Sequence, residues 1–326
     1  MNHSLPTRSE HSGDAARAVV AGAVSQRADA RVGRPVTSIR TLDADGVRVF
    51  YREAGAPDRP VVLLLHGFPA SSFMFRELMP RLADRYRVIA PDLPGFGFTE
   101  VPATRNYAYS FDALAGTIAA FTEALHLDRF ALYVFDYGAP TGFRLAMAHP
   151  ERVAAIVSQN GNAYDAGLGD AWAPIQRYWR EPTPRNREAV RRELSPDGIR
   201  AQYVYGVPDP AAIAPEGYTL DAALIARPGN MDIQLDLLLD YANNVRLYPA
   251  FQHYFRQAQP PLLAVWGKHD PFFIPAGAEA FRNDLPQAQV QFLETGHFAT
   301  ETHVVDIAAA MRAFLHAHGA ASDQSA

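Results

Sequence analysis

Three polar residues, Asp136, Asp270 and His297, follow separate apolar stretches of the chain and together have the composition of a catalytic site. Asp136 directly follows residues 130–135, and His297 lies shortly beyond residues 290–293. In open α/β sheets, reactive groups collect at the carboxyl ends of the strands, so we expect the three side chains to meet. A carboxylate is ionised at neutral pH and can displace a leaving group from an sp³ carbon, which leaves an alkyl ester on the protein.

The other two residues suit the hydrolysis of such an ester. His297 would take a proton from the attacking water, and Asp270 would orient the imidazole and stabilise its charged form. Each residue also has an ordinary interpretation, because an Asp after a strand often caps a helix or forms a turn. The occurrence of all three at strand ends, with a further turn at residues 66–69, favours catalysis. No carboxylate follows the strand at 153–157 until Asp165, so Asp270 is the better candidate for the acid.

Residues 133–140 predict a sharp turn around Asp136. Two small residues follow shortly after the aspartate, and Pro140 is tolerated in the first turn of a helix. A buried strand, a sharp turn and a helix together make a nucleophile elbow, in which the central residue is usually Ser. Here that residue is Asp136, and no Gly-x-Ser-x-Gly motif occurs, so a serine esterase is disfavoured.

Strands that alternate with helices predict an α/β fold with a mostly parallel, doubly wound sheet. We expect strands at residues 47–54 (an antiparallel edge strand), 60–65, 86–90, 130–135, 153–157, 262–266 and 290–293. Residues 162–255 contain no clear buried strand but many aromatic residues and prolines, and we interpret them as a helical lid. The predicted organisation is a flexible N-terminal extension (1–36), a core (37–161 and 256–318), the inserted lid (162–255) and a short tail (319–326).

The composition excludes several classes of function. The 326 residues include no cysteine, so disulfides, thiolate nucleophiles and Cys-ligated metals are excluded. The net charge of −5 provides no basic footprint for nucleic acid. No apolar run approaches the roughly 20 residues that span a bilayer. We expect no metal and no cofactor, a cytoplasmic location, and a leader peptide at the N-terminus only as a disfavoured alternative, while the oligomeric state stays open.

From about residue 40 to residue 318, the chain resembles the α/β-hydrolase superfamily, specifically its aspartate-nucleophile branch of epoxide hydrolases and haloalkane dehalogenases. The order of nucleophile, acid and histidine is that of the superfamily. The motif His-Gly-Phe-Pro at 66–69 resembles the oxyanion turn of epoxide hydrolases. Residues 71–76 and 89–97 resemble a haloalkane dehalogenase at least as much.

The resemblance implies roles for further residues. The backbone N–H groups of Phe68 and Tyr137 occupy the positions of an oxyanion hole. The segments 178–182 and 240–244 resemble those that carry the epoxide-activating tyrosines of the family, which implies that Tyr178 and Tyr241 donate to the leaving oxygen. The alternative donors, for a halide, are Trp172 and Trp179.

Departures from the family pattern bear on the substrate. Both subfamilies usually have Trp after the nucleophile, where this chain has Tyr137, and some dehalogenases have Asn where it has Phe68. These differences weaken halide binding more than epoxide opening, whereas Val134, at a position where Gly is common, predicts altered packing of the elbow. The leading hypothesis is a cofactor-free hydrolase that opens epoxides to diols. The alternatives are a haloalkane or haloacid dehalogenase and a non-catalytic ligand-binding scaffold. The lid aromatics predict a small, apolar organic substrate, with water as the second reactant.

Overall fold

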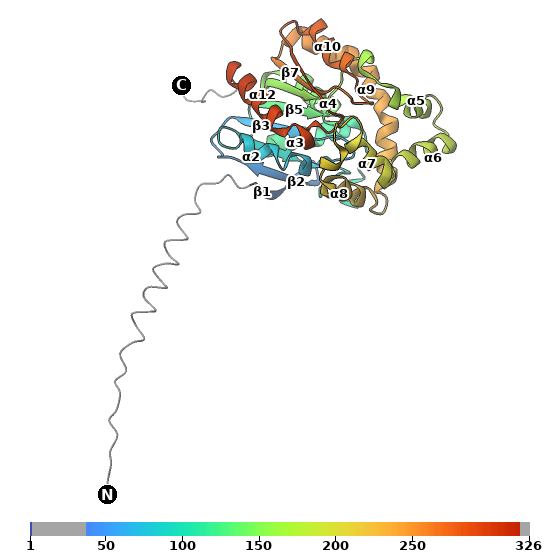
Figure 1. Ribbon diagram of the computed structural model, residues 1–326, viewed down its shortest axis with the longest axis horizontal. Helices are drawn as coiled ribbons and strands as arrows, with labels where there is room; N and C mark the ends of the chain where they lie inside the picture. Colours follow the sequence, from blue (N-terminus) through green and yellow to red (C-terminus); the bar gives the residue numbers. More distant parts are fainter. Residues whose placement is uncertain (2–36, 320–326) are drawn as a thin grey trace. The chain divides into compact units, whose positions relative to one another are not determined.

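The computed structural model of the protein describes Met1 and residues 37–319, so the predicted extension and tail lie almost entirely outside the described residues. A sheet lies among the helices (Figure 1), and its eight strands have the order β1-β2-β4-β3-β5-β6-β7-β8. The strands are β1 (Ser38–Ala44), β2 (Val47–Ala54), β3 (Val61–Leu65), β4 (Arg87–Pro91), β5 (Phe130–Phe135), β6 (Val153–Gln159), β7 (Leu262–Gly267) and β8 (Gln289–Leu293). Strand β2 pairs antiparallel with β1 and β4, and the neighbouring pairs from β4 to β8 are parallel.

Helices cover both faces of the sheet. The core helices are α2 (Leu78–Leu82), α3 (Phe111–Ala124), α4 (Gly138–Ala148), α10 (Pro275–Asp284), α11 (Ala299–Thr302) and α12 (Val304–Ala317). Side chains of α3, α4 and α10 belong to one hydrophobic cluster, and side chains of α2 and α12 belong to the other. The short 3₁₀ helices are η2 (Ser72–Phe75), η3 (Ala103–Arg105), η4 (Pro150–Arg152), η5 (Asp165–Gly167), η6 (Asp170–Trp172) and η7 (Pro210–Ala212).

Strand β5 shows why the central strands read as continuous apolar runs. All six of its residues are buried. Phe130, Leu132 and Val134 pack into one cluster, whereas the alternate residues Ala131, Tyr133 and Phe135 pack into the other. A strand in the middle of a parallel sheet is covered on both faces, so neither set of side chains can be polar.

The segment between β6 and β7, residues 160–261, is helical and contributes no strand to the sheet; we call it the insertion. Its helices are α5 (Ala173–Arg180), α6 (Pro184–Glu193), α7 (Pro196–Val204), α8 (Pro215–Ile225) and α9 (Asn230–Ala258). Proline stands first in α6, α7 and α8, where its missing N–H has no helical partner to lose. The long helix α9 packs on the core through Phe251 and Phe255, whose rings contact Phe143 of α4.

Two local predictions differ from the structure. Strand β1 was not predicted, and it takes the edge position expected for residues 47–54; most of its side chains are exposed, so it carries little hydrophobic signal. After Ser71 the chain forms two short helices, η2 and α2, where the sequence predicts one helix that runs to about residue 84. Pro80 explains the division, because proline is tolerated in the first turn of α2 but not inside a longer helix that starts near residue 72.

None of the helices in the described part of the chain combines the length and hydropathy needed to cross a membrane.

Candidate active site

Asp136 lies at the carboxyl end of β5, in the sharp turn that leads into α4. Its backbone φ is +47°, a left-handed conformation that is uncommon for a residue other than glycine and that recurs at functional sites. The turn has no room for a side chain at Gly138, where a Cβ atom would lie 2.2 Å from the carbonyl oxygen of Leu65. Gly67 is equally constrained, because its Cβ would lie 2.3 Å from Asp136 Oδ1. The small residues therefore allow the carboxylate to stand between two loops.

Val134, at the position where glycine was expected, is accommodated by glycines on its neighbours. A Cβ atom at Gly142 of α4 would lie 2.6 Å from Val134 Cγ1, and one at Gly161 would lie 3.2 Å from Val134 Cγ2. The isopropyl group thus fills the space that these two glycines leave. Val134 is thus accommodated by α4 and by the segment after β6.

The two oxygens of Asp136 have different surroundings. Oδ1 accepts hydrogen bonds from the backbone N–H groups of Phe68, at 2.7 Å, and Tyr137, at 2.6 Å. Oδ2 faces His297, whose Nε2 lies 3.9 Å away. The predicted oxyanion donors therefore converge on one oxygen of Asp136 and leave the other without a hydrogen-bonding partner among the described residues.

The Phe68 loop is fixed by a buried histidine. His66 Nδ1–H donates to the carbonyl oxygen of Gly67 at 3.0 Å, and Nε2 accepts from the backbone N–H of Leu93 at 2.9 Å. These two contacts require the neutral imidazole, and burial lowers the pKa of His66 accordingly. Asp92 holds the neighbouring loop, because its two oxygens accept from the N–H groups of Ser72 and Phe98. The loop carrying one oxyanion donor is thus held from several sides.

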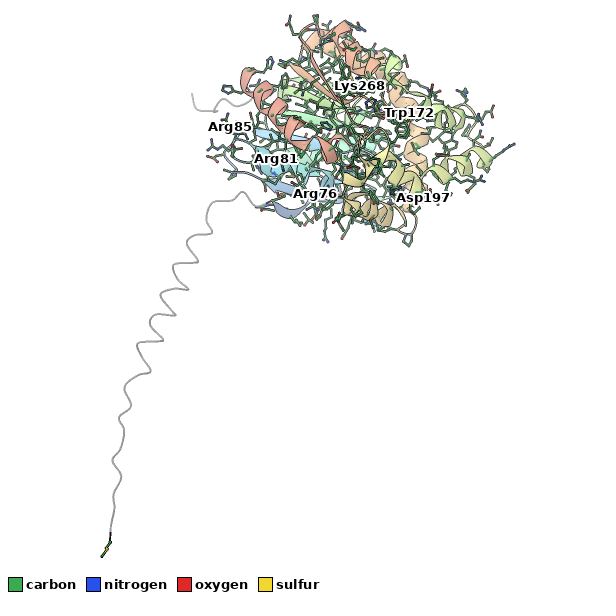
Figure 2. The ribbon with its side chains drawn as sticks, viewed as in Figure 1. Arg76, Arg81, Arg85, Trp172, Asp197 and Lys268 are labelled. Atoms are coloured by element: carbon green, nitrogen blue, oxygen red, sulfur yellow. The ribbon has the colours of Figure 1, made fainter. Side chains whose placement is uncertain are left out.

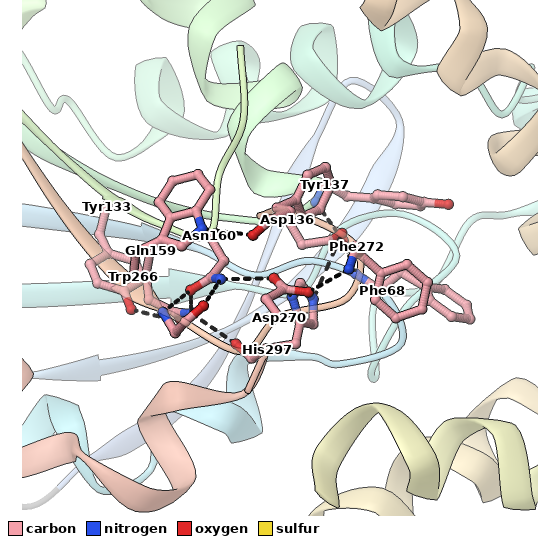
Figure 3. A network of polar contacts seen from close by, with 12 residues as sticks. Phe68, Tyr133, Asp136, Tyr137, Gln159, Asn160, Trp266, Asp270, Phe272 and His297 are labelled. Atoms are coloured by element: carbon pink, nitrogen blue, oxygen red, sulfur yellow. Dashed lines mark hydrogen bonds and ion pairs between the residues drawn. The ribbon is translucent and has the colours of Figure 1, made fainter. Parts of the chain in front are cut away.

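Asp270 and His297 form a close, buried pair (Figure 3). His297 Nδ1 lies 2.6 Å from Asp270 Oδ2, and Asp270 Oδ1 accepts from the backbone N–H of Phe272 at 2.8 Å. Burial by itself lowers the pKa of His297, but the charge of Asp270, its hydrogen bond and the charge of Asp136 outweigh burial and raise it. A carboxylate in this position orients the imidazole and stabilises its protonated form.

Burial raises the pKa of Asp136 to about 6, although the charge of His297 and the hydrogen bonds from Phe68 and Tyr137 act in the opposite direction. The carboxylate is therefore ionised at neutral pH but poorly solvated. A poorly solvated anion is a more reactive nucleophile than one surrounded by water.

Asn160 is a further site residue that the sequence analysis did not identify. Its Nδ2 donates to Asp270 Oδ2 at 2.7 Å, and its Oδ1 accepts from the backbone N–H of Gly267 at 2.8 Å. Gln159, beside it, donates to Asn160 Oδ1 and to the carbonyl oxygen of His297 (Figure 3). Gln159 is the last residue of β6 and Asn160 follows it, at a strand end where the sequence has no carboxylate. An amide in that position was the available signal.

A cavity of about 340 Å³ lies against Asp136, between the core and the insertion. Core and insertion both line it, through Phe68, Asp136, Tyr137, Ala171, Trp172, Pro174, Ile175, Val190, Glu193, Leu194, Gly198, Ala201, Gln202, Tyr205, Leu238, Pro271, Phe272 and His297. Most of these side chains are apolar, and none of the described lining residues is Lys or Arg. The cavity suits a small, uncharged organic molecule.

Of the four donors expected in the insertion, only Trp172 is among the described residues that line the cavity. Neither Tyr178 nor Tyr241 lines the cavity. The Tyr178 hydroxyl accepts from Arg187 Nη1 at 3.0 Å. The Tyr241 ring packs 4.5 Å, centroid to centroid, from that of Trp172. In α5 the cavity is lined one turn earlier, by Pro174 and Ile175, so Tyr178 lies beyond it.

The two tryptophans differ from each other. Trp179 is committed to the fold, because its indole N–H donates to the carbonyl oxygen of Leu238 at 2.7 Å. Trp172 lines the cavity, is buried near α9 (Figure 2), and its indole N–H has no hydrogen-bonding partner among the described residues. The Tyr137 hydroxyl is likewise buried and without a partner in this part of the chain. The Tyr241 hydroxyl is in the same state, so the buried donors at this site without a partner among the described residues are Trp172 and Tyr241, which the sequence analysis named, and Tyr137, which it named only for its backbone N–H.

Comparisons with known proteins agree with this geometry. Residues 60–197 match the family model of the alpha/beta hydrolase fold. An uncharacterised hydrolase of Saccharomyces cerevisiae is 52% identical over 81% of this chain and 92% of its own length. A haloalkane dehalogenase of Mycobacterium marinum is 30% identical over 72% of this chain and 76% of its own length.

Solved structures show the same architecture. The crystal structure of an epoxide hydrolase from Vigna radiata, 24% identical, superimposes with a TM-score of 0.68 over 86% of this chain and 98% of that one. At this identity the likeness concerns the fold. Together with the sheet order, the elbow and the similarity of the yeast relative, these matches establish that the chain belongs to the α/β-hydrolase family and is a hydrolase.

Proposed function

We propose that the protein acts through a covalent ester on Asp136. The observation that carries this proposal is the different surroundings of the two carboxylate oxygens: Oδ1 accepts hydrogen bonds from two backbone N–H groups, whereas Oδ2 faces His297. Oδ2 would attack an sp³ carbon of the substrate, forming a carbon–oxygen bond while the bond to the leaving group breaks. Oδ1 would then be the carbonyl oxygen of the ester and would already lie in the oxyanion hole.

Hydrolysis of the ester requires a base. Water would attack the carbonyl carbon of the Asp136 ester and give its proton to His297 Nε2, whose opposite nitrogen is held by Asp270. The negative charge would develop on Oδ1, where Phe68 and Tyr137 donate. Collapse of the intermediate expels the product alkoxide, which takes the proton back from His297. The carboxyl group left on Asp136 has one oxygen from water, and it gives up the second proton of that water to the leaving group of the first step, or to solvent where that group is a halide. In this scheme the insertion acts as a lid that limits the entry of other water.

The substrate that we propose is an uncharged epoxide. The leaving oxygen of an epoxide departs as an alkoxide and needs a hydrogen-bond donor or a proton, whereas a halide needs no proton. Tyr137, directly after the nucleophile, has a buried hydroxyl without a partner among the described residues, and burial raises its pKa well above the ordinary value, so the phenol stays protonated. We assign it the donor role that the sequence gave to Tyr178 and Tyr241.

A haloalkane is the second candidate, and Trp172 is the observation that favours it. Indole N–H groups hold halides in the family, and this one is buried beside the cavity without a partner among the described residues. The relative from Mycobacterium marinum is consistent with such a reaction. A haloacid is disfavoured, because its carboxylate would lie near Asp136 in a cavity whose described lining includes no Lys or Arg. The intact arrangement of Asp136, Asp270 and His297 disfavours a non-catalytic scaffold.

The proposal is tested with paired substrates and isotope labelling. A panel of terminal epoxides and 1-haloalkanes of equal chain length is assayed for diol and for halide release, and we expect diol formation to dominate. In a single turnover in heavy-oxygen water, the label should enter the carboxylate of Asp136, and Asp136→Ala should release neither product. Label found only in the product, or turnover by Asp136→Ala, would contradict the covalent mechanism; halide release alone would replace the epoxide by the haloalkane.

A further inference from the structure

Three polar side chains line the cavity without taking part in the proposed chemistry: Glu193, Gln202 and Tyr205. Glu193 is the last residue of α6, and the other two lie at the end of α7 and just after it, three positions apart. None of the three side chains has a hydrogen bond or ion pair with any described residue, although most polar side chains near the site do. Glu193 and Tyr205 are exposed, so these groups are solvated and available to a ligand without loss of a protein contact.

These three residues differ from Asp136 and His297 in their chemistry and in the part of the chain that carries them. Asp136 and His297 come from the core, whereas Glu193, Gln202 and Tyr205 come from the insertion. The rest of the insertion's contribution is mainly apolar and includes Ile175, Leu194 and Leu238. The cavity therefore offers a reactive group, an apolar surface and a separate polar group, which is the pattern expected for an amphipathic ligand.

The chemistry of the three side chains selects one kind of polar group. An ionised carboxylate only accepts hydrogen bonds, and a carboxamide and a phenol can both accept as well as donate. A ligand group that donates, such as a hydroxyl or an ammonium, can use all three, and an ammonium also gains from the charge of Glu193. A carboxylate on the ligand would face Glu193 with no cationic side chain among the described lining residues.

We propose that Glu193, Gln202 and Tyr205 form a subsite for a hydrogen-bond-donating group, hydroxyl or ammonium, carried by an otherwise apolar substrate away from its reacting carbon. This subsite rests on the proposed reaction at Asp136 and specifies the substrate class for it. Because the subsite contacts a part of the substrate that does not react, it stabilises the ground state and the transition state equally. Its effects should therefore lie in KM and leave kcat nearly unchanged.

The test uses four terminal epoxides with one chain length and different distal groups: methyl, hydroxyl, ammonium and carboxylate. In the wild type, kcat/KM should be lowest for the carboxylate. Glu193→Gln should reduce the ratio of kcat/KM for the ammonium over the carboxylate by about three- to tenfold, through KM, and should change the methyl substrate by less than about twofold. Gln202→Ala combined with Tyr205→Phe should reduce the preference for hydroxyl over methyl.

A matched control is Glu216→Gln, because Glu216 is an exposed residue of α8 that does not line the cavity. Glu216→Gln changes the net charge by the same amount as Glu193→Gln. It should leave the ratio of kcat/KM for the ammonium over the carboxylate within about twofold of the wild-type value at the same ionic strength. The subsite would be overturned if the ratio of kcat/KM for the ammonium over the carboxylate were equal in wild type and Glu193→Gln, or if Glu216→Gln changed it as much as Glu193→Gln does. The proposed reaction would still stand in that case if heavy oxygen entered the Asp136 carboxylate. Absence of both turnover and label for all four epoxides would overturn the proposed reaction and the subsite with it.

Discussion

His297 stands between two carboxylates at unequal distances: Nδ1 lies 2.6 Å from Asp270 Oδ2, and Nε2 lies 3.9 Å from Asp136 Oδ2. The first distance is that of a short, charge-assisted hydrogen bond, and the second is too long for a hydrogen bond. Nε2 is therefore not hydrogen-bonded to Asp136 and remains free to receive a proton from water, although the charge of His297 still favours the ionised carboxylate. The geometry fits a histidine that acts only in the second half of the reaction.

The first prediction follows from this division. His297→Gln should leave alkylation of Asp136 intact and stop hydrolysis of the ester, so the protein should accumulate a covalent adduct. Intact-protein mass should rise by the mass of one epoxide, and peptide mapping should place the adduct on Asp136. Asp136→Asn, mixed with the same epoxide, is the control and should show no added mass. An adduct on another residue, or normal turnover by His297→Gln, would rule out the assigned roles.

The second prediction concerns pH. Alkylation needs ionised Asp136, whose pKa burial raises to about 6, so its single-turnover rate should fall as the pH drops below about 6. Ester hydrolysis needs neutral His297, whose pKa is raised because the charge and hydrogen bond of Asp270 outweigh the effect of burial. As the pH falls, the rate of ester hydrolysis should therefore decline at a higher pH than the rate of alkylation. Quenched-flow mass spectrometry should find more ester on the wild type near pH 6 than at pH 8.5, and equal amounts at both would contradict this order.

The third prediction is that the nucleophile destabilises the fold. The folded-state pKa of Asp136 is about 6, against an ordinary value of 3.8, so as pH rises the unfolded chain loses this proton first. The wild type therefore loses stability between pH 3.8 and pH 6 and does not regain it above that range. The variant Asp136→Asn has no carboxyl group to titrate at this position, so the free energy of unfolding of the variant should exceed that of the wild type by about 3 kcal/mol at pH 8. Urea denaturation at pH 8 and pH 4 measures the difference, which should nearly vanish at pH 4.

The sequence located the core of the site because the relevant patterns are local. An apolar run followed by small residues identifies the elbow at Asp136, and the stretches before Asp270 and His297 have the same form. The structure brings these three side chains together at one edge of the sheet. Strand β1 was missed because its side chains are mostly exposed and its pairing with β2 is the main reason that it is a strand.

The donors to the leaving group could not be predicted in the same way. Tyr178 and Tyr241 each lie three residues beyond a residue that lines the cavity, Ile175 in α5 and Leu238 in α9, so they share its helix face but not the turn that reaches the cavity. Which turn of a helix reaches the cavity depends on tertiary packing, and a short motif does not determine it. Tyr178 contacts Arg187, and Arg187 in turn pairs with Asp232 and Asp236 of α9. Asn160 was missed for another reason: its role depends on a left-handed backbone and on distant partners, neither of which a single amide in the sequence reveals.

The fourth prediction assigns Asn160 a positioning role toward Asp270. The residue has φ +47°, so Asn160→Ala removes the hydrogen bond to Asp270 and also strains the backbone. Asn160→Gly removes the same hydrogen bond without the strain, and comparison of the two separates the effects. Both variants should slow ester hydrolysis about tenfold or more and leave alkylation within about twofold. Both should also lose stability, because the buried Gly267 N–H and the Gln159 amide lose their acceptor, and Asn160→Ala should lose roughly 1 kcal/mol more through strain. Equal slowing of both steps would indicate a merely structural role.

The last prediction identifies the donor to the leaving group. The Tyr137 hydroxyl is buried without a partner among the described residues, so Tyr137→Phe removes no protein hydrogen bond and should not destabilise the fold. If the phenol donates to the epoxide oxygen as it leaves, the variant should raise the activation free energy for alkylation of Asp136 by roughly 2–4 kcal/mol, as loss of an oxyanion donor does. Ester hydrolysis should change little, because its oxyanion is held by backbone N–H groups.

Tyr178→Phe and Tyr241→Phe are the matched controls for Tyr137→Phe, because neither residue lines the cavity. Tyr178→Phe should lose about 1 kcal/mol of stability with its hydrogen bond from Arg187, and both variants should alkylate at nearly the wild-type rate. Single-turnover rates with one epoxide and one haloalkane distinguish the donors, since Trp172→Phe should slow only the haloalkane. If Tyr178→Phe and Tyr241→Phe greatly slowed alkylation by the epoxide and Tyr137→Phe did not, Tyr178 and Tyr241 would be the donors to the leaving oxygen. The insertion would then have to move when substrate binds, because neither residue lines the cavity.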